Sequence, residues 1–511
     1  MGKQETESSE DEDERNELIP ILDKDTVCPN GRFDDHITEM TVDDTPTELE
    51  PHLTLFSTVL FAVGQVIGSG IFVSPNEVVK QVGSPGMALT IWVVSGLISL
   101  CGALSFSELG TLISRSGGEY QYLRAAYGKL VAFLYMWVCG VLRNSMGCAV
   151  IALTFSSYLA ALFISVDHAH FEFAKKAGAA SAIVIIIAVN SCSTKYGVRM
   201  VNFFCVLKIA ALIVLILLGA WKLSSGETEN INVGFKGSEL NPAVWTTAFF
   251  AALWSYSGWN CINVMSGEIK NPKKNLPRAL VISQFLLITL FVMANIAYCS
   301  ILTLAELNGQ EAIALTVGKN MFGKFGDRWG RFGEIFFGVS VAISSFGSLS
   351  SSLIVSSRLP FIAAQEGMFP KCVALIQTRT GTPIVGLIYI GIAAFLCVWP
   401  SNISHLIGYV GFLSWFWWGL CFLAVPVLRW KMPDCPRKFK ICLVVPIVAF
   451  ISTVYLVVGP FFVNFLPTFS WVLLTLLGVP IYYGYIDDEK SCSRWMERTV
   501  EFLAKLLKAE L

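Results

Sequence analysis

Two short segments containing glycine interrupt long apolar stretches of this chain, and they would expose backbone groups able to bind charge. The first segment is Gly68-Ser69-Gly70, inside an apolar stretch over residues 53–79. The second, Ser255-Tyr256-Ser257-Gly258, lies in a later apolar stretch. Glycine costs a helix about 1 kcal/mol relative to alanine, and a backbone group without a partner in hydrocarbon costs more. Both breaks therefore require surroundings of protein, water or a bound polar ligand.

The chemistry of such a break follows from the two helix ends that it creates. The helix after the break begins with free N–H groups that carry partial positive charge, which suits a carboxylate. The helix before the break ends in free carbonyls, which suit an ammonium group or a sodium ion. Two breaks together could bind the backbone of a free α-amino acid without a charged side chain. Paired broken helices in corresponding halves of a chain are typical of transporters.

Glycines in an apolar helix also have a simpler explanation, in which small residues let neighbouring helices pack closely. For Gly68 and Gly70 alone we would favour that explanation. The second break favours a binding site instead, because it is flanked by aromatic and polar residues that could surround a ligand, namely Trp254, Tyr256, Trp259 and Asn260.

The composition is that of a membrane protein. Of the 511 residues, 54 % are hydrophobic and only 15 % are charged, whereas soluble proteins carry about 25 % charged residues. A helix needs about 20 apolar residues to cross the hydrocarbon core. We therefore expect an all-α polytopic protein with twelve transmembrane helices, near residues 53–80, 86–113, 128–163, 178–194, 200–221, 243–267, 278–303, 332–363, 384–400, 403–428, 442–463 and 468–486.

The sequence shows no chemistry typical of an enzyme. A membrane enzyme would need a nucleophile or a metal cluster, and neither is apparent. The 14 cysteines have no metal-ligand spacing, and most lie in apolar stretches, where cysteine behaves as a small hydrophobe. We therefore expect no catalytic residue, no metal site and no cofactor. Twelve spans with two breaks at mid-membrane also argue against a receptor.

The net charge of −1 hides a strong asymmetry. Residues 1–50 contain 17 acidic and four basic residues without a periodic apolar pattern, which predicts an acidic, disordered tail. Lys and Arg gather in the loops on one side of the predicted spans, and the positive-inside rule makes this side cytoplasmic. An even number of spans places both termini there. We expect a multi-pass plasma-membrane protein with a transporter domain over 51–486 and a cytoplasmic C-terminal tail over 487–511.

A set of motifs runs through the chain in a defined order. The first apolar stretch carries Val66-Ile67-Gly68-Ser69-Gly70-Ile71-Phe72-Val73-Ser74-Pro75. The later motifs are Glu108-Leu109-Gly110, Tyr256-Ser257-Gly258-Trp259-Asn260, Glu268-Ile269-Lys270-Asn271-Pro272, Asn275-Leu276-Pro277, Ser345-Phe346-Gly347 and Ser356-Ser357-Arg358-Leu359. Over about residues 52–440 the chain resembles the L-type amino acid transporters. These are the light chains of heteromeric transporters in the amino acid–polyamine–organocation superfamily.

The resemblance implies a LeuT-type fold, in which helices 1–5 and 6–10 form inverted repeats and helices 1 and 6 are broken. The repeats would span about residues 53–221 and 243–428, and helices 11 and 12 would span 442–486. It also implies sodium-independent exchange of neutral L-amino acids by alternating access, and the aromatic lining favours large or aromatic side chains. The alternatives are a sodium- or proton-coupled symporter and, in a different class, a channel.

By position, the resemblance assigns substrate binding to residues of both breaks. Ser69 and Gly70 would bind the substrate carboxylate, and carbonyls near Val66, Ile67 and Trp254 would bind its amino group. Trp254 also stands where the family has its gating aromatic residue, usually phenylalanine. The other residues expected around the substrate are Gly68, Ser255, Ser257, Gly258, Trp259 and Asn260, with Phe412 and Trp415 from helix 10.

Two basic residues lie deep within predicted spans, where a charge is costly and usually functional. In the resembled fold, a lysine at the position of Lys208 takes the place of a sodium ion and links helix 5 to helices 1 and 8. This would give Lys208 a coupling role, with a structural ion pair inside the bundle as the alternative. Arg143 is interpreted as a structural or gating residue, because family members with neutral substrates also have an arginine there.

The chain departs from the resembled family in one loop. Light chains of the heteromeric type carry a cysteine in the external loop between helices 3 and 4, which forms a disulfide to a single-pass glycoprotein. The corresponding loop here, over residues 164–176, contains no cysteine. A glycoprotein heavy chain could therefore bind only without the usual disulfide. The other expected partners are amino acid substrates and the lipid bilayer, and no nucleic acid is expected.

Overall fold

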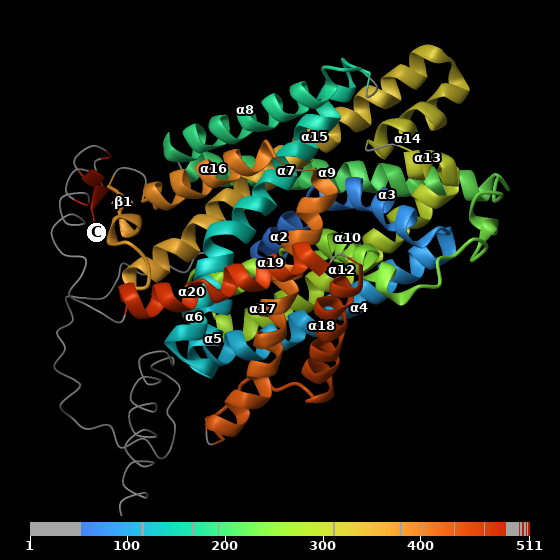
Figure 1. Cartoon of the computed structure of the whole chain (residues 1–511). Coiled ribbons are helices and arrows are strands. Elements are labelled where there is room, and N and C mark those ends of the chain that lie inside the picture. Colours follow the sequence, from blue (N-terminus) through green and yellow to red (C-terminus); the bar gives the residue numbers. More distant parts are fainter. Residues whose placement is uncertain are drawn as a thin grey trace, which may run out of the picture.

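The computed structural model describes residues 53–486, apart from short gaps at 114–116, 166–167, 193, 310–311, 379–380, 401, 434 and 464, together with a few positions after residue 499. The predicted acidic tail over 1–50 and most of the predicted C-terminal tail lie outside the described residues. The described chain is almost entirely helical (Figure 1), and its one small sheet pairs β1 (Ile376–Gln377) with β2 (Ala509–Glu510).

Eight helical segments of the described chain are long and apolar enough to cross a membrane. A ninth span is formed by α2 (Leu55–Val66) and α3 (Gly70–Val82), which pass the same test as a bent pair. The eight are α4 (Pro85–Leu112), the run of α6 (Lys129–Tyr135), η2 (Met136–Arg143) and α7 (Asn144–Ala161), α9 (Thr194–Ser224), α12 (Pro272–Ile301), α15 (Asp327–Gln365), α17 (Ile403–Lys431), α18 (Val444–Val463), and the run of α19 (Phe465–Leu476), α20 (Gly478–Ile481) and η7 (Tyr482–Ile486).

The other three predicted spans are also helical, although they fall outside those length and composition limits. They correspond to α8 (Phe171–Cys192), α10 (Pro242–Tyr256) with α11 (Cys261–Val264), and α16 (Ile384–Val398). The predicted boundaries agree within a few residues for most spans. The fourth and eighth helices begin earlier than predicted, at Phe171 and Asp327. The number of twelve membrane crossings stays a prediction.

Both predicted helix breaks are present in the described chain. α2 and α3 meet at an angle of 45° across residues 67–69. α10 ends at Tyr256, and turns over residues 257–260 separate it from α11. The second break thus starts at Ser257, two residues after the first residue of its sequence motif, because Ser255 and Tyr256 remain helical. α10 packs against α3 and α11 contacts α2, so each broken helix lies against the other.

Corresponding helices of the two predicted repeats pack against each other. α4 lies against α12, α7 against α15, and α8 against α16, in addition to the contacts between the broken helices. Such pairing is what two inverted five-helix repeats require. α9 and α17 complete the two sets of five, and α18 packs on the outside against α10 and α17.

Short helices connect several of the long ones. α5 (Glu119–Tyr127) precedes the third span, and α13 (Leu304–Gly309) and α14 (Ile313–Phe322) lie between α12 and α15. Gly318 and Gly333 bring α14 and α15 into backbone contact, because a Cβ atom on either glycine would overlap the carbonyl group of the other. The 3-10 turns are η3 (Ile231–Val233), η4 (Ser266–Glu268), η5 (Gly323–Phe325) and η6 (Lys371–Ala374).

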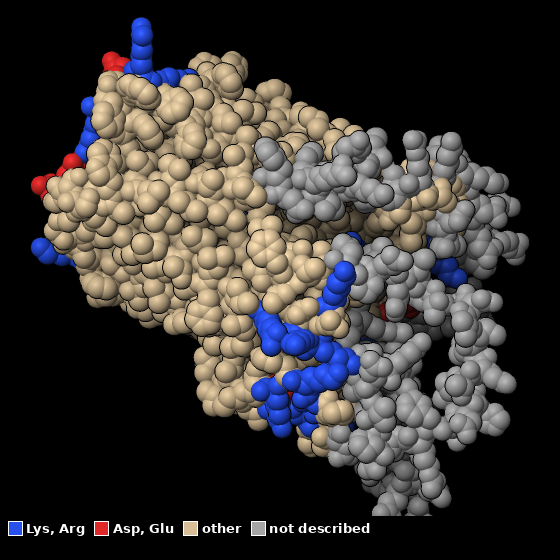
Figure 2. Space-filling view, turned by 180° about the vertical axis from the view of Figure 1, so that it is seen from behind, with Lys and Arg blue, Asp and Glu red and all other residues tan. Residues whose placement is uncertain are grey.

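Charged residues gather at separate parts of the surface. Figure 2 shows Lys, Arg, Asp and Glu at two ends of the face in view, with a broad uncharged region between them. Exposed apolar side chains such as Leu97, Val206 and Phe285 lie on the long helices, as a lipid-facing surface requires. We call the end that holds the connections 113–118 and 265–271, together with 366–383 and 432–443, the basic end.

Candidate functional site

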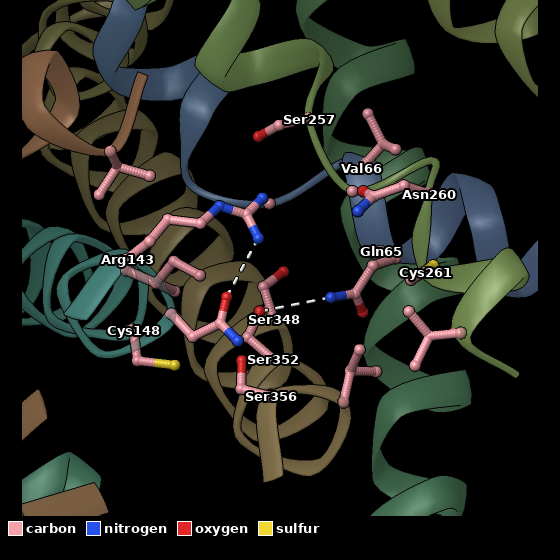
Figure 3. A pocket seen from close by; sticks show the side chains of 18 of the residues that line it. Gln65, Val66, Arg143, Cys148, Ser257, Asn260, Cys261, Ser348, Ser352 and Ser356 are labelled. Atoms are coloured by element: carbon pink, nitrogen blue, oxygen red, sulfur yellow. Dashed lines mark hydrogen bonds between the residues drawn. The ribbon is translucent and has the colours of Figure 1, made fainter. Parts of the chain in front are cut away.

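A cavity of about 150 Å³ lies between the two helix breaks. Figure 3 shows side chains around it from α2, the third span, the second break and α15. The two breaks contribute Val66, Gly68, Ser69, Gly70, Trp254, Ser257, Gly258 and Asn260 to its wall, and Arg143 also lines it. The structure therefore brings most of the sequence-predicted residues of both breaks to one place.

The first break presents the start of α3 to this cavity. Ile67 leaves the helical conformation with ψ of 87°, and its N–H donates to the carbonyl of Val63 at 2.9 Å. The first four N–H groups of an α-helix have no acceptor within that helix. α3 begins at Gly70, which lines the cavity beside Ser69. The partial positive charge of this helix end is therefore available to an anion at the cavity wall.

At the second break, Ser257 forms hydrogen bonds with the backbone at the end of α10. Its backbone N–H and its Oγ donate to the carbonyl of Trp254 at 3.2 Å and 2.6 Å. The same carbonyl is one of those predicted to bind the substrate's amino group, so an ammonium group there would have to displace a serine hydrogen bond. Gly258 follows with φ of 110°, a conformation that favours glycine.

Five of the predicted binding residues do not line this cavity, and their binding roles stay predictions. Trp259 is fully buried and packs edge-on against Phe106, with ring centroids 4.9 Å apart. In α17, the residue at the cavity wall is Val410, while Trp415 packs against Trp418. The five residues are Ile67, Ser255, Trp259, Phe412 and Trp415.

Glu119 lines the cavity although it was not among the predicted substrate-binding residues, since its position near the end of the second span indicated a gate or packing contact. Its side chain is buried, and Oε1 accepts hydrogen bonds from Asn260 Nδ2 and, at 3.0 Å, from Trp418 Nε1. Glu119 thus joins α5 to the second break and to α17. The signal for Glu119 in the sequence was the glycine pair directly before it, Gly117 and Gly118. In the structure these glycines have φ of 125° and 51° and form the turn into α5.

Arg143 connects the third span to α17 at the cavity. Its Nε donates to Ser414 Oγ at 2.8 Å, and its Nη1 donates to Asn144 Oδ1 at 3.1 Å. The guanidinium carbon lies 5.4 Å from the ring centroid of Trp418. The residue ends η2, a π-helical turn, and such turns inside α-helices are frequent at functional sites. Its gating role stays a prediction.

Lys208 joins three helices from a buried position in α9. Its Nζ donates to the carbonyl of Gly64 in α2 and, at 3.1 Å, to Ser348 Oγ in α15. These contacts are between helix 5 and helices 1 and 8, as the resemblance implied. Gly64 lies just before the first break, and Ser348 lines the cavity. The ammonium group therefore holds the end of α2 next to the site, while its coupling role stays a prediction.

A row of serines on α15 forms a polar wall that the sequence analysis also missed. Ser348, Ser352 and Ser356 line the cavity, and Gln65 Nε2 donates to Ser352 Oγ at 3.3 Å (Figure 3). Residues four positions apart share one face of a helix. The repeated spacing of these serines in an apolar stretch was the signal in the sequence.

Two contacts join the segments around the second break to their neighbours at the basic end. Glu268 of η4 pairs with Arg358 of α15. Leu53 and Ile269 form a short parallel bridge, with Leu53 N–H donating to the Glu268 carbonyl and Lys270 N–H to the Leu53 carbonyl, each at 2.9 Å. Both contacts would have to change if this end of the bundle opened.

The chain matches known proteins over most of its length. The amino acid permease family model matches residues 53–483. The chain is 34 % identical to the human "b(0,+)-type amino acid transporter 1", with 86 % of this chain and 89 % of the relative covered. It is 35 % identical to the human "Large neutral amino acids transporter small subunit 2" (85 % and 80 % covered) and 32 % identical to the human "Cystine/glutamate transporter" (90 % of each).

A solved structure shares the fold. The "Crystal structure of MhsT in complex with L-phenylalanine" aligns with a TM-score of 0.52 at 13 % identity, covering 79 % of this chain and all of that chain. This likeness and the two broken helices show the LeuT-type fold that the sequence motifs implied. Because the family model covers most of the sequence and the relatives exceed 30 % identity over 85–90 % of it, the chain belongs to the amino acid permease family.

Proposed function

We propose that this chain exchanges neutral L-amino acids, preferably large or aromatic ones, across the plasma membrane by alternating access. The observation that carries the proposal is a cavity walled by two interrupted helices, which offers backbone charge of both signs to a zwitterion. The names of the relatives, which include a transporter of large neutral amino acids, support the same substrate class.

The substrate's carboxylate would bind at the start of α3, near Ser69 and Gly70. Its amino group would face carbonyls at the ends of α2 and α10, near Val66 and Trp254, and would displace the Ser257 hydroxyl from the Trp254 carbonyl. The apolar part of the cavity wall, including Trp254 and Ile151, suits an apolar side chain. The relatives' names differ in substrate, so the preferred side chain requires a competition panel of amino acids against one labelled substrate.

Sodium independence is proposed from the contacts of Lys208. Its ammonium group already donates to the Gly64 carbonyl, next to the break where a sodium ion would otherwise bind. A fixed positive charge there removes the need for a cation from solution. A sodium- or proton-coupled symporter would behave differently, because its uptake would fall without sodium or change steeply with pH.

We propose that the basic end faces the cytoplasm, with both termini on that side. The name of one relative contains "small subunit", which indicates an assembly for that protein. In this chain, residues 164–176 contain no cysteine. We therefore propose that it works alone or with a glycoprotein held without a disulfide in that loop.

The test is exchange in proteoliposomes that contain only the purified chain. Preloading with an unlabelled neutral amino acid should accelerate uptake of a labelled one, with or without sodium. Equal uptake into empty and loaded vesicles would contradict obligatory exchange. Current without any internal substrate would instead indicate a channel. Activity of the purified chain alone would exclude a required heavy chain.

A further inference from the structure

The basic end carries exposed positive charge from two separate segments. Lys270 is exposed just before α12, and Lys274 and Arg278 are exposed in its first two turns. Lys438 and Lys440 are exposed in the connection between α17 and α18. One gathering of Lys and Arg side chains is visible in the lower part of Figure 2. These five residues are called the basic surface below.

Four carboxylates near this end are already engaged inside the protein. Glu108 accepts from the Arg429 side chain at 2.8 Å and 2.6 Å and from the Ile441 N–H at 2.9 Å. Glu119 bonds Asn260 and Trp418, while Glu268 pairs with Arg358 and Glu366 pairs with Arg124. These four carboxylates are buried or half-buried. They are therefore not available to the basic surface.

The two segments of the basic surface meet around the end of α4. Glu108 of α4 holds the connection between α17 and α18 through Arg429 and Ile441. Two residues further along α4, Gly110 lies against α12, since a Cβ atom on it would lie 3.3 Å from Leu276 Cδ2. Both basic segments thus flank the same helix end and can act on one ligand.

The acidic segment 1–50 is attached directly beside this surface. Leu53, at the start of the described chain, is bonded to the backbone on both sides of Ile269, next to Lys270. The segment that precedes it carries 17 acidic and four basic residues, a net charge of −13. A tethered anion has a high effective concentration at a nearby basic surface. We propose that residues 1–50 bind the basic surface of their own chain.

Anionic lipid headgroups are the other class of partner for a basic surface at a membrane. The acidic segment is favoured because it is covalently joined to the chain just before Leu53, whose carbonyl accepts the Lys270 N–H at 2.9 Å. This attachment does not depend on the lipid composition.

Binding is tested by carbodiimide cross-linking of the full chain in vesicles of zwitterionic lipid, followed by mass spectrometry. Cross-links should join carboxylates of 1–50 to Lys270, Lys274, Lys438 or Lys440. They should disappear in about 1 M salt, where the Debye length is about 3 Å. The internal control is Lys236, which is exposed in the connection before α10 at the opposite end. Missing cross-links, or equal cross-linking to Lys236, would overturn the proposal.

Discussion

Gly70 and Ser255 bring the two broken helices into direct contact. A Cβ atom on Gly70 would lie 2.6 Å from the Cα and 2.7 Å from the Oγ of Ser255, which is closer than real Cβ atoms approach. The start of α3 and the end of α10 therefore touch through their backbones. This contact sets the spacing of the two helix ends that wall the cavity.

Gly70→Ala is expected to abolish most transport. Its methyl group meets backbone rather than a flexible side chain, and overpacking of this kind costs about 1–3 kcal/mol. The helix ends would move apart by enough to lose a substrate backbone bound between them. Uptake and surface abundance should be measured together. Gly408→Ala in α17 is the matched control, because no atom lies within 4 Å of its added Cβ, and loss of transport there would contradict the argument.

Lys208→Met nearly keeps the length of the side chain but removes its charge. We expect this variant to impair exchange strongly. The Gly64 carbonyl and Ser348 Oγ would lose their donor in a buried place, and an unmet hydrogen-bonding group costs about 1–3 kcal/mol. The measurement is exchange in the presence and absence of sodium, with thermal stability in detergent. Normal, sodium-independent turnover of the variant would leave the lysine without a role in coupling.

The variants Glu119→Gln and Glu119→Ala should differ in thermal stability and in transport. Glutamine keeps an oxygen for Asn260 Nδ2 and Trp418 Nε1, so this variant should fold normally. Alanine leaves both buried donors without an acceptor, which costs about 1–3 kcal/mol for each group. We expect the alanine variant to melt at lower temperature and to lose transport. Equal behaviour of the two variants in thermal unfolding would show that these hydrogen bonds do not hold the second break.

Arg358→Gln tests the ion pair next to the second break. Glu268 is buried, with 6 % of its side chain exposed, and removing the partner of a buried charge costs about 3–5 kcal/mol. The control is Lys324→Gln, whose pair with Glu227 is exposed and worth about 0–1 kcal/mol. Thermal unfolding of the two variants compares them. Equal destabilisation would mean that Glu268 is solvated in the protein.

Glu306, which accepts a hydrogen bond from Thr303 at the start of α13, should make the stability of the protein depend on pH. Burial by itself would raise the pKa of Glu306, but hydrogen bonds from Asn320 and Thr303 outweigh it and lower the pKa below its ordinary value. A lowered pKa contributes stability that is present above the carboxyl's unfolded pKa and is lost as pH falls through its folded pKa.

Glu306→Gln should therefore reduce the loss of stability between neutral and acidic pH. The change should be modest, since a lost helix cap costs on the order of 1 kcal/mol. Unfolding temperatures of both proteins at pH 7 and at about pH 3, well below the pKa of about 4.3 for an unfolded glutamate, provide the comparison. An identical pH dependence in the two would exclude this carboxylate as a source of acid sensitivity.

The sequence by itself determined the long helices and the two breaks that interrupt the first and sixth of them. Apolar length and glycine content act locally, so the positions of the spans and of Gly68-Ser69-Gly70 could be read without knowledge of packing. The motifs also led to the family, and with it to the contact of Lys208 with helices 1 and 8. Local chemistry was sufficient for these features.

The tertiary structure alone decided which side chains meet around the cavity. Glu119 and the serines of α15 lie far from both breaks in the sequence, and only packing brings them to the site. Packing also buries Phe412 and Trp415 behind the wall, and the local turn at Ser257 occupies the Trp254 carbonyl. These outcomes depend on contacts between distant segments, and the spacing of residues along one helix does not encode such contacts.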